Sequence, residues 1–139
     1  MVSVKPFIMT KTNAGFKHPT ESECKNTLNS IADALYVIGG KWKLRIIVAL
    51  KENNRRFNDL HRTIDGISAK VLSSELKDLE LNGFVQRNVF TGSPVVVEYE
   101  LTDYCDTLNE VLQSLSAWGA MHKQKVRSSM KDNKIITAN

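Results

Sequence analysis

The stretch that decides the fold of this chain is residues 39–102, GGKWKLRIIVALKENNRRFNDLHRTIDGISAKVLSSELKDLELNGFVQRNVFTGSPVVVEYELT. Residues 42–50 are apolar around most of a helical cylinder, which predicts a buried helix that stops at the two asparagines that follow. Residues 57–64 place large apolar side chains at helical spacing and predict a short second helix, closed by Gly66. The first half of the stretch therefore predicts two short helices joined by a turn.

A third helix of this stretch is expected to begin after Ser68, whose hydroxyl can accept a hydrogen bond from a backbone N–H at the helix start. Leu72, Leu76 and Leu79 follow the spacing i, i+4, i+7 and predict the side that packs on the core. The opposite side carries small, polar or basic residues, namely Ala69, Lys70, Ser73, Ser74 and Lys77. A helix side of this kind fits the major groove of a DNA duplex.

A β-hairpin is predicted after this helix. Residues 84–90 and 95–101 are rich in β-branched and aromatic residues, and they flank a Thr-Gly-Ser-Pro turn. Two helices, a capped polar-faced helix and a hairpin, in this order, are typical of a winged helix-turn-helix. The expected fold is mainly α with a small β-hairpin, and it presents one helix and one hairpin to a nucleic-acid duplex.

The two ends of the chain lie outside this unit. Residues 1–22 lack periodicity and are expected to form a flexible arm, residues 23–130 the domain with its terminal helices, and residues 131–139 a frayed tail. One terminal helix is expected from Lys25, and a long last helix after Thr102, a candidate N-cap. Their apolar stripes need a cover, and a second subunit is the simplest one; packing back onto the same domain is the alternative. The predicted dimer interface comprises Leu28, Leu108, Val111, Leu112, Leu115 and Trp118.

Length and composition indicate one cytoplasmic domain. The chain has 139 residues, of which 42% are hydrophobic, enough for one ordinary core. No apolar run approaches the about 18 residues of a membrane span, and no secretory signal pattern is visible. Two cysteines without zinc-ligand spacing indicate neither a disulfide framework nor a metal site, and no cofactor is expected.

The positive charge is concentrated on the predicted helix-turn-helix. Residues 41–70 carry eight Lys or Arg and three Asp or Glu, a net charge of +5. Residues 71–103 carry two basic and six acidic residues, a net charge of −4, although the whole chain is at +4. This distribution favours a nucleic-acid partner at the helices, and a solvated charged face is the alternative.

Several short motifs carry a family resemblance. They are Cys24, IGGKWK at 38–43, RRFNDL at 55–60, GIS at 66–68, LSSELKDLE at 72–80, GFV at 83–85 and VEYELT at 97–102. In this order they resemble the HxlR-type family of bacterial winged helix-turn-helix transcription regulators, and the first two multi-residue motifs together are specific. The resemblance covers roughly residues 24–120.

The resemblance implies a homodimer that binds a pseudo-palindromic DNA operator and represses or activates nearby genes. The helix after Ser68 would enter the major groove, the hairpin would lie along the backbone or minor groove, and the terminal helices would form the dimer interface. Wings of this family often carry Pro-Pro-Arg, where this chain has Pro94-Val95-Val96, so no minor-groove arginine is expected from that position.

The candidate DNA contacts divide into three groups. Phosphate contacts set position and affinity, and base contacts set sequence preference. Arg55 and Arg56 are the predicted phosphate clamps, with Lys41 and Lys43 as weaker candidates and Ser68 at a helix start. The predicted base-reading residues are Lys70, Ser73, Ser74 and Lys77, and the predicted wing contacts are Arg87, Thr91 and Ser93.

The two cysteines suggest control by thiol chemistry. Cys24 aligns with the N-terminal cysteine that members of the family use to sense oxidants or electrophiles, and it lies near a helix start, where the dipole favours negative charge. Cys105 is a candidate to resolve an oxidised Cys24 by forming a disulfide. An ordinary apolar role is the alternative for Cys24, and an inert buried thiol the alternative for Cys105.

Other functions remain as alternatives at this point. A small ligand could control the protein from a pocket between helices, or the domain could bind a protein without a DNA role. An enzyme is not expected, because His18, His61 and His122 are scattered without nucleophile or base spacing.

Overall fold

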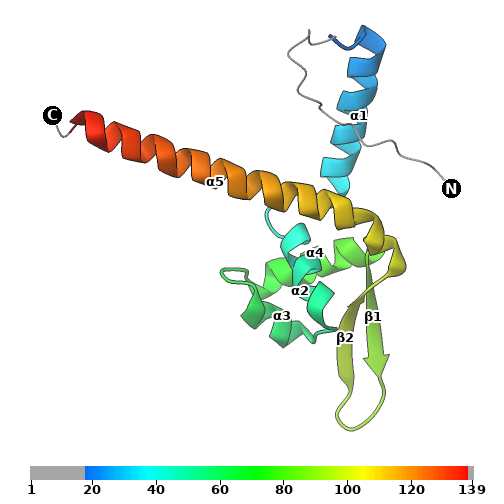
Figure 1. Ribbon diagram of the computed structural model, residues 1–139. Helices are drawn as coiled ribbons and strands as arrows, with labels where there is room; N and C mark the ends of the chain where they lie inside the picture. Colours follow the sequence, from blue (N-terminus) through cyan, green and yellow to red (C-terminus); the bar gives the residue numbers. More distant parts are fainter. Residues whose placement is uncertain (1–17, 138–139) are drawn as a thin grey trace. The chain divides into compact units, whose positions relative to one another are not determined.

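The computed structural model describes residues 18–137, and the described chain divides into two parts that meet between Ala34 and Leu35. The first part contains most of helix α1, Glu21–Ile38. The second contains all the other elements shown in Figure 1. No helix among the described residues is long and apolar enough to cross a membrane.

Helix α1 begins earlier than the sequence predicts. Thr20 and Glu23 form a reciprocal cap, in which the Thr20 backbone N–H donates to Glu23 Oε2 at 2.8 Å and the Glu23 N–H donates to Thr20 Oγ1 at 3.3 Å. The helix therefore starts at Glu21, and the predicted arm of residues 1–22 overlaps it. The rest of that arm, residues 1–17, lies outside the described residues.

The second part has the element order that the sequence predicts. Its helices and strands are α2 (Lys43–Glu52), α3 (Phe57–Thr63), α4 (Ala69–Leu81), β1 (Val85–Phe90), β2 (Val96–Leu101), the 3₁₀ helix η1 (Asp103–Leu108) and α5 (Asn109–Thr137). Figure 1 shows α2, α3 and α4 gathered beside the upper part of the β1–β2 hairpin, with α5 extending away from them. The prediction of a mainly helical fold with one antiparallel hairpin is confirmed.

The core lies between α2, α3, α4 and the base of the hairpin. Ile46, Ile47, Leu60, Leu72 and Leu79 are each fully buried at 0% exposure. Each side chain of this size stabilises the fold by about 1.5–3 kcal/mol through burial. The three leucines expected to face the core from α4 do so, which leaves the opposite side of that helix exposed.

The hairpin is tied to the helices at one edge. The backbone N–H of Arg55 donates to the Tyr99 carbonyl at 3.1 Å, and the Tyr99 N–H donates to the Arg55 carbonyl at 2.8 Å. This bridge attaches β2 to the loop between α2 and α3. Val85 pairs with Leu101 at the base of the hairpin, and Val85 is buried in the core. The wing is therefore fixed at its base and free at its tip.

The C-terminal region differs from the prediction in three ways. A 3₁₀ helix precedes α5, and the Thr102 hydroxyl donates to the Gly83 carbonyl rather than capping a helix. Leu108 is buried in the core and Leu112 packs against it, so Leu108 is corrected from a dimer-interface residue to a core residue. Helix α5 continues to Thr137, past position 131, where the sequence predicts the tail to begin.

Candidate nucleic-acid interface

The exposed side of α4 is the centre of the candidate interface. Ser68 stands at its N-cap, and its Oγ accepts a hydrogen bond from the Val71 backbone N–H at 3.1 Å, as predicted. Lys70, Ser74 and Lys77 are exposed on this helix, and Ser73 is half-buried. Their spacing of three and four residues places them on one side of the helix. Neither lysine forms an ion pair within residues 18–137, so both remain available for a partner.

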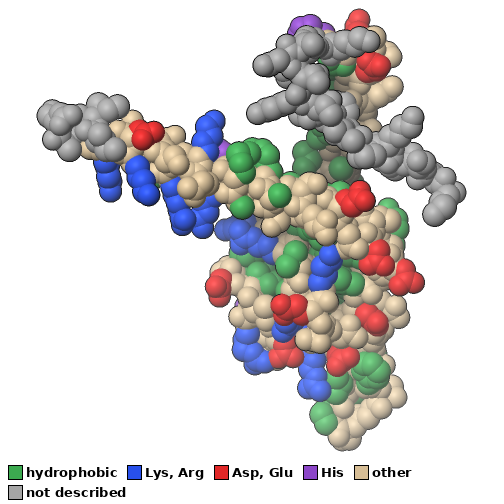
Figure 2. Space-filling model, viewed as in Figure 1, with side chains coloured by type: hydrophobic (Ala, Val, Ile, Leu, Met, Phe, Trp, Pro, Cys, Tyr) green, Lys and Arg blue, Asp and Glu red, His purple; other side chains and the backbone are tan. Residues whose placement is uncertain are grey.

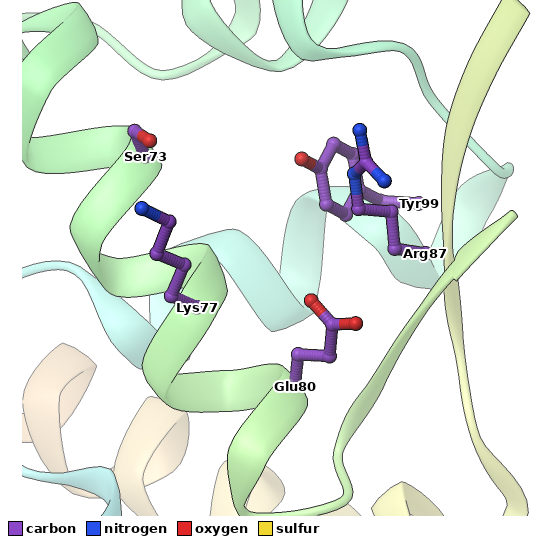
Figure 3. Close-up of a pocket in the computed structure, with 5 residues that line it drawn as sticks. All are labelled: Ser73, Lys77, Glu80, Arg87 and Tyr99. Atoms are coloured by element: carbon purple, nitrogen blue, oxygen red, sulfur yellow. The ribbon is translucent and has the colours of Figure 1, made fainter. Parts of the chain in front are cut away.

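A hollow joins this side of α4 to the hairpin. It has a volume of about 380 Å³ and is lined by Ser73, Lys77, Glu80, Arg87 and Tyr99. Figure 3 shows the first three coming from α4 and the last two from the facing hairpin. Arg87 is directly opposite Tyr99 in the β1–β2 register, so their side chains share one face of the hairpin. The structure thus brings together three predicted contact residues that are up to 14 positions apart in the chain.

Glu80 and Tyr99 are the two residues of the hollow that the sequence does not predict as DNA contacts. A signal for Tyr99 existed, because counting outward from the Thr-Gly-Ser-Pro turn pairs it with Arg87. For Glu80, the three-residue step from Lys77 places it on the same side of α4.

The acidic residues of the wing are separated from this face. Glu98 pairs with Asn88, and Glu100 accepts a hydrogen bond from Asn88 Nδ2 at 2.7 Å. Successive residues of a strand point to opposite faces, so these carboxylates lie on the other face from Arg87 and Tyr99. The carboxylates of Glu98 and Glu100 are therefore not part of the hollow. Thr91 and Ser93 are exposed in the turn at the hairpin tip.

Arg55 and Arg56 are adjacent in sequence but differ in role. The Arg55 side chain is 22% exposed and forms an ion pair with Glu52 at 3.1 Å. Its Nε donates to the Ala49 carbonyl at 3.0 Å, and its third contact is Thr63 Oγ1 at 3.5 Å. Its guanidinium therefore holds α2, α3 and their loop together, which favours a structural role for Arg55 over the predicted phosphate clamp. Arg56 is exposed at the N-cap of α3, and its side chain has no hydrogen bond or ion pair in the described part of the chain.

Lys43 also has a structural role. Its Nζ lies 2.6 Å from Glu75 Oε2 and 3.4 Å from Asp78 Oδ2, and its side chain is 13% exposed. The hydrogen bond to Glu75 raises the pKa of Lys43 above its ordinary value, and burial opposes this effect only in part. Lys43 therefore joins α2 to α4, which favours a structural role over the predicted phosphate contact. Lys41 is exposed and stands over the Trp42 ring at 4.8 Å from the centroid, which leaves it at the surface.

The two cysteines occupy opposite environments. Cys24 is exposed in the first turn of α1, and its neighbour Lys25 pairs with Glu21 at 3.5 Å. Cys105 is 2% exposed, and burial raises the pKa of its thiol. The structure therefore favours the alternative for Cys105, an inert buried thiol, over a resolving role.

Apolar side chains remain exposed on both terminal helices. On α1, Leu28 is 61% exposed. On α5, Leu115 is 50% and Trp118 59% exposed, and Val111 is 40% exposed. Figure 2 shows hydrophobic side chains on the first half of α5 and lysine and arginine side chains along its second half. No cluster of three or more His, Cys, Asp or Glu that could hold a metal ion occurs in the described ranges.

Comparison with known proteins identifies the family of the chain. The family model described as HxlR-like helix-turn-helix matches residues 37–127. The uncharacterized HTH-type transcriptional regulator YtcD of Bacillus subtilis (strain 168) is 40% identical over 97 residues, which are 70% of this chain and 77% of that protein. The uncharacterized HTH-type transcriptional regulator BH0655 of Halalkalibacterium halodurans is 42% identical over 108 residues, which are 73% of this chain and 96% of that protein.

A solved structure adds a functional comparison. The redox regulator HypR in its oxidised form is 34% identical, with a TM-score of 0.62 over 66% of this chain and 95% of that one. The relatives are transcription regulators, a class without enzymatic activity. The family model covers the helix-turn-helix, the wing and most of α5, and the chain belongs to the HxlR-like helix-turn-helix family of transcription regulators.

Proposed function

We propose that this regulator binds a pseudo-palindromic operator as a homodimer, with α4 in the major groove and the hairpin along the adjacent backbone. The observation that carries the proposal is the unpaired polar and basic side of α4, which continues across the hollow to Arg87. Lys70 and Ser74 would read base edges, and Arg56 would contact a phosphate. The dimer would repress or activate according to where its operator lies, and it would act in the cytoplasm.

The test begins by selecting bound duplexes from a random DNA library with the full-length protein. Lys70→Ala and Ser74→Ala should change the ranking of operators mutated one base at a time. Lys123→Ala, at an exposed lysine of α5, is the matched control and should leave the ranking unchanged. Selection that enriches no sequence, or rankings that are the same for all these proteins, would contradict sequence reading by α4.

The dimer is proposed to form through the exposed apolar surfaces of the terminal helices. Leu115 and Trp118 lie one helical turn apart on α5, and both are more than one-third exposed. Analytical ultracentrifugation should give a dimer for the wild type and a monomer for Trp118→Asp. A monomeric wild type at micromolar concentration would refute the proposal.

A second proposal concerns control by oxidation at Cys24. Its support is the exposure of this thiol, the burial of the other cysteine, and the similarity to the redox regulator HypR. Because Cys105 is buried, a bridge would join Cys24 to a thiol from outside the chain's core, such as a low-molecular-weight thiol or the same cysteine of a second subunit. Non-reducing gels and mass spectrometry after diamide treatment should show an adduct or bridge at Cys24, absent in Cys24→Ser. Unchanged DNA binding after complete modification would remove the regulatory role.

A further inference from the structure

The hollow between α4 and the hairpin contains charges that the fold itself does not use. Lys77 and Arg87 are both exposed, and neither forms an ion pair within the described residues. Glu80 also lines the hollow, and Figure 3 shows its carboxylate directed from α4 toward Arg87 and Tyr99. No ion pair joins Glu80 to either cation in the described part of the chain. Lys43 and Arg55, by contrast, are held by carboxylates.

Tyr99 supplies a fixed hydroxyl at the same place. Its backbone is held by both hydrogen bonds to Arg55, and its ring packs against the core. Figure 3 shows the hydroxyl pointing from the hairpin toward α4, and this group has no hydrogen-bond partner within residues 18–137. A hydroxyl on a ring that packs against the core can donate to an anion with little further loss of conformational freedom.

We propose that the hollow is the seat of one DNA phosphodiester per half-site, with Arg87, Lys77 and Tyr99 as donors and Glu80 as the residue that limits its affinity. The two cations and one carboxylate give the hollow a net charge of +1, which matches the single negative charge of a phosphodiester. A phosphate monoester carries about −1.5 to −2 near neutral pH and is matched less well. Ser73 belongs both to the hollow and to the outer side of α4, so a backbone seated here lies beside the groove that α4 reads.

This inference rests on the proposed function, and it assigns Tyr99 and Glu80 roles that the family resemblance does not. Glu80 repels every phosphate that approaches the hollow, whatever the base sequence. It therefore lowers the affinity for all DNA and makes binding depend more on base contacts from α4.

The experiment uses the full-length protein and a duplex selected by it, prepared as a series in which one phosphate at a time is replaced by an uncharged methylphosphonate. At one position per half-site the replacement should weaken wild-type binding about ten-fold, the value of one hydrogen bond to a charged group. At that position the replacement should weaken Tyr99→Phe and Arg87→Ala much less, because the contact is already lost. Tyr104→Phe, at an exposed tyrosine outside the hollow, is the matched control and should behave as the wild type.

Glu80→Gln should bind both selected and random duplexes about two- to five-fold more tightly, since one repulsive charge is removed at moderate screening. If every methylphosphonate costs the wild type and Tyr99→Phe the same factor, the hollow holds no phosphate and this inference fails. The proposed function fails separately, when the wild type selects no duplex. Inorganic phosphate could also stabilise the wild type but not Arg87→Ala, while no methylphosphonate position stands out from the others. That result would assign the hollow to a free anion and would also overturn the proposal.

Discussion

Exchanging Arg55 and Arg56 for alanine one at a time separates a structural arginine from a DNA-binding one. Arg55→Ala removes a charged hydrogen bond to the Ala49 carbonyl at 3.0 Å, worth about 1.5 kcal/mol at the lower end of such bonds. It also removes the ion pair to Glu52, whose side chain is 76% exposed, worth about 0.5 kcal/mol. The expected loss in the free energy of unfolding is therefore about 2 kcal/mol, or about 7 °C in Tm for a chain of 139 residues.

The control for this prediction is the neighbouring residue. Arg56→Ala should leave Tm unchanged, because its side chain has no partner in the described residues, and should lower the slope of log affinity against log salt by about one unit. Arg55→Ala should leave that slope unchanged. Thermal unfolding by circular dichroism at one fixed protein concentration, and DNA titrations at four salt concentrations, give both quantities. Equal stability of the two variants, or a loss of salt slope in Arg55→Ala, would refute the assignment of roles.

Three further outcomes are expected. Ser68→Ala should lower the free energy of unfolding by about 1 kcal/mol, since the Val71 N–H loses its cap, and urea titration measures this loss. A thiol reagent should label Cys24 at once but Cys105 only on unfolding, and two sites labelled equally fast under native conditions would contradict the burial. Because burial raises the pKa of Cys105 above its ordinary 9.0, its contribution to stability is complete below that pH and is lost as pH rises through the folded value. Urea titrations near pH 7 and pH 10 should therefore show a larger alkaline loss for the wild type than for Cys105→Ala, and equal losses would exclude this linkage.

The local features of the fold could be predicted from the sequence because neighbouring residues determine them. The Ser68 cap depends on a residue three positions away, and the core side of α4 follows from the spacing of Leu72, Leu76 and Leu79. The cap at Thr20 is equally local, but its Thr-x-x-Glu signal lies inside a segment whose lack of periodicity predicts an arm.

The roles of individual charges could not be predicted in the same way. Lys43 meets Glu75 across 32 positions of sequence, and nothing in the composition of α2 indicates that partner. Arg55 is held by a carbonyl and a carboxylate of α2, whereas its neighbour Arg56 is exposed, a difference set by the loop geometry. A cluster of basic residues therefore predicts a nucleic-acid surface more reliably than it predicts which of its members contact the DNA.

The backbone bridge between Arg55 and Tyr99 also determines how the wing moves. An isolated two-stranded hairpin is only marginally stable in water, and here a third segment supports the outer edge of β2. The hairpin should therefore pivot near Tyr99 rather than at the end of α4. The part between Tyr99 and α4 is held stiffly, and the part between Tyr99 and the turn can bend. In hydrogen exchange, the Tyr99 amide should be protected almost as well as the core. Amides that lie closer to the turn than Val97 should exchange by local opening. A wing hinged at this level can follow DNA of different groove width while the hollow at its base keeps its shape.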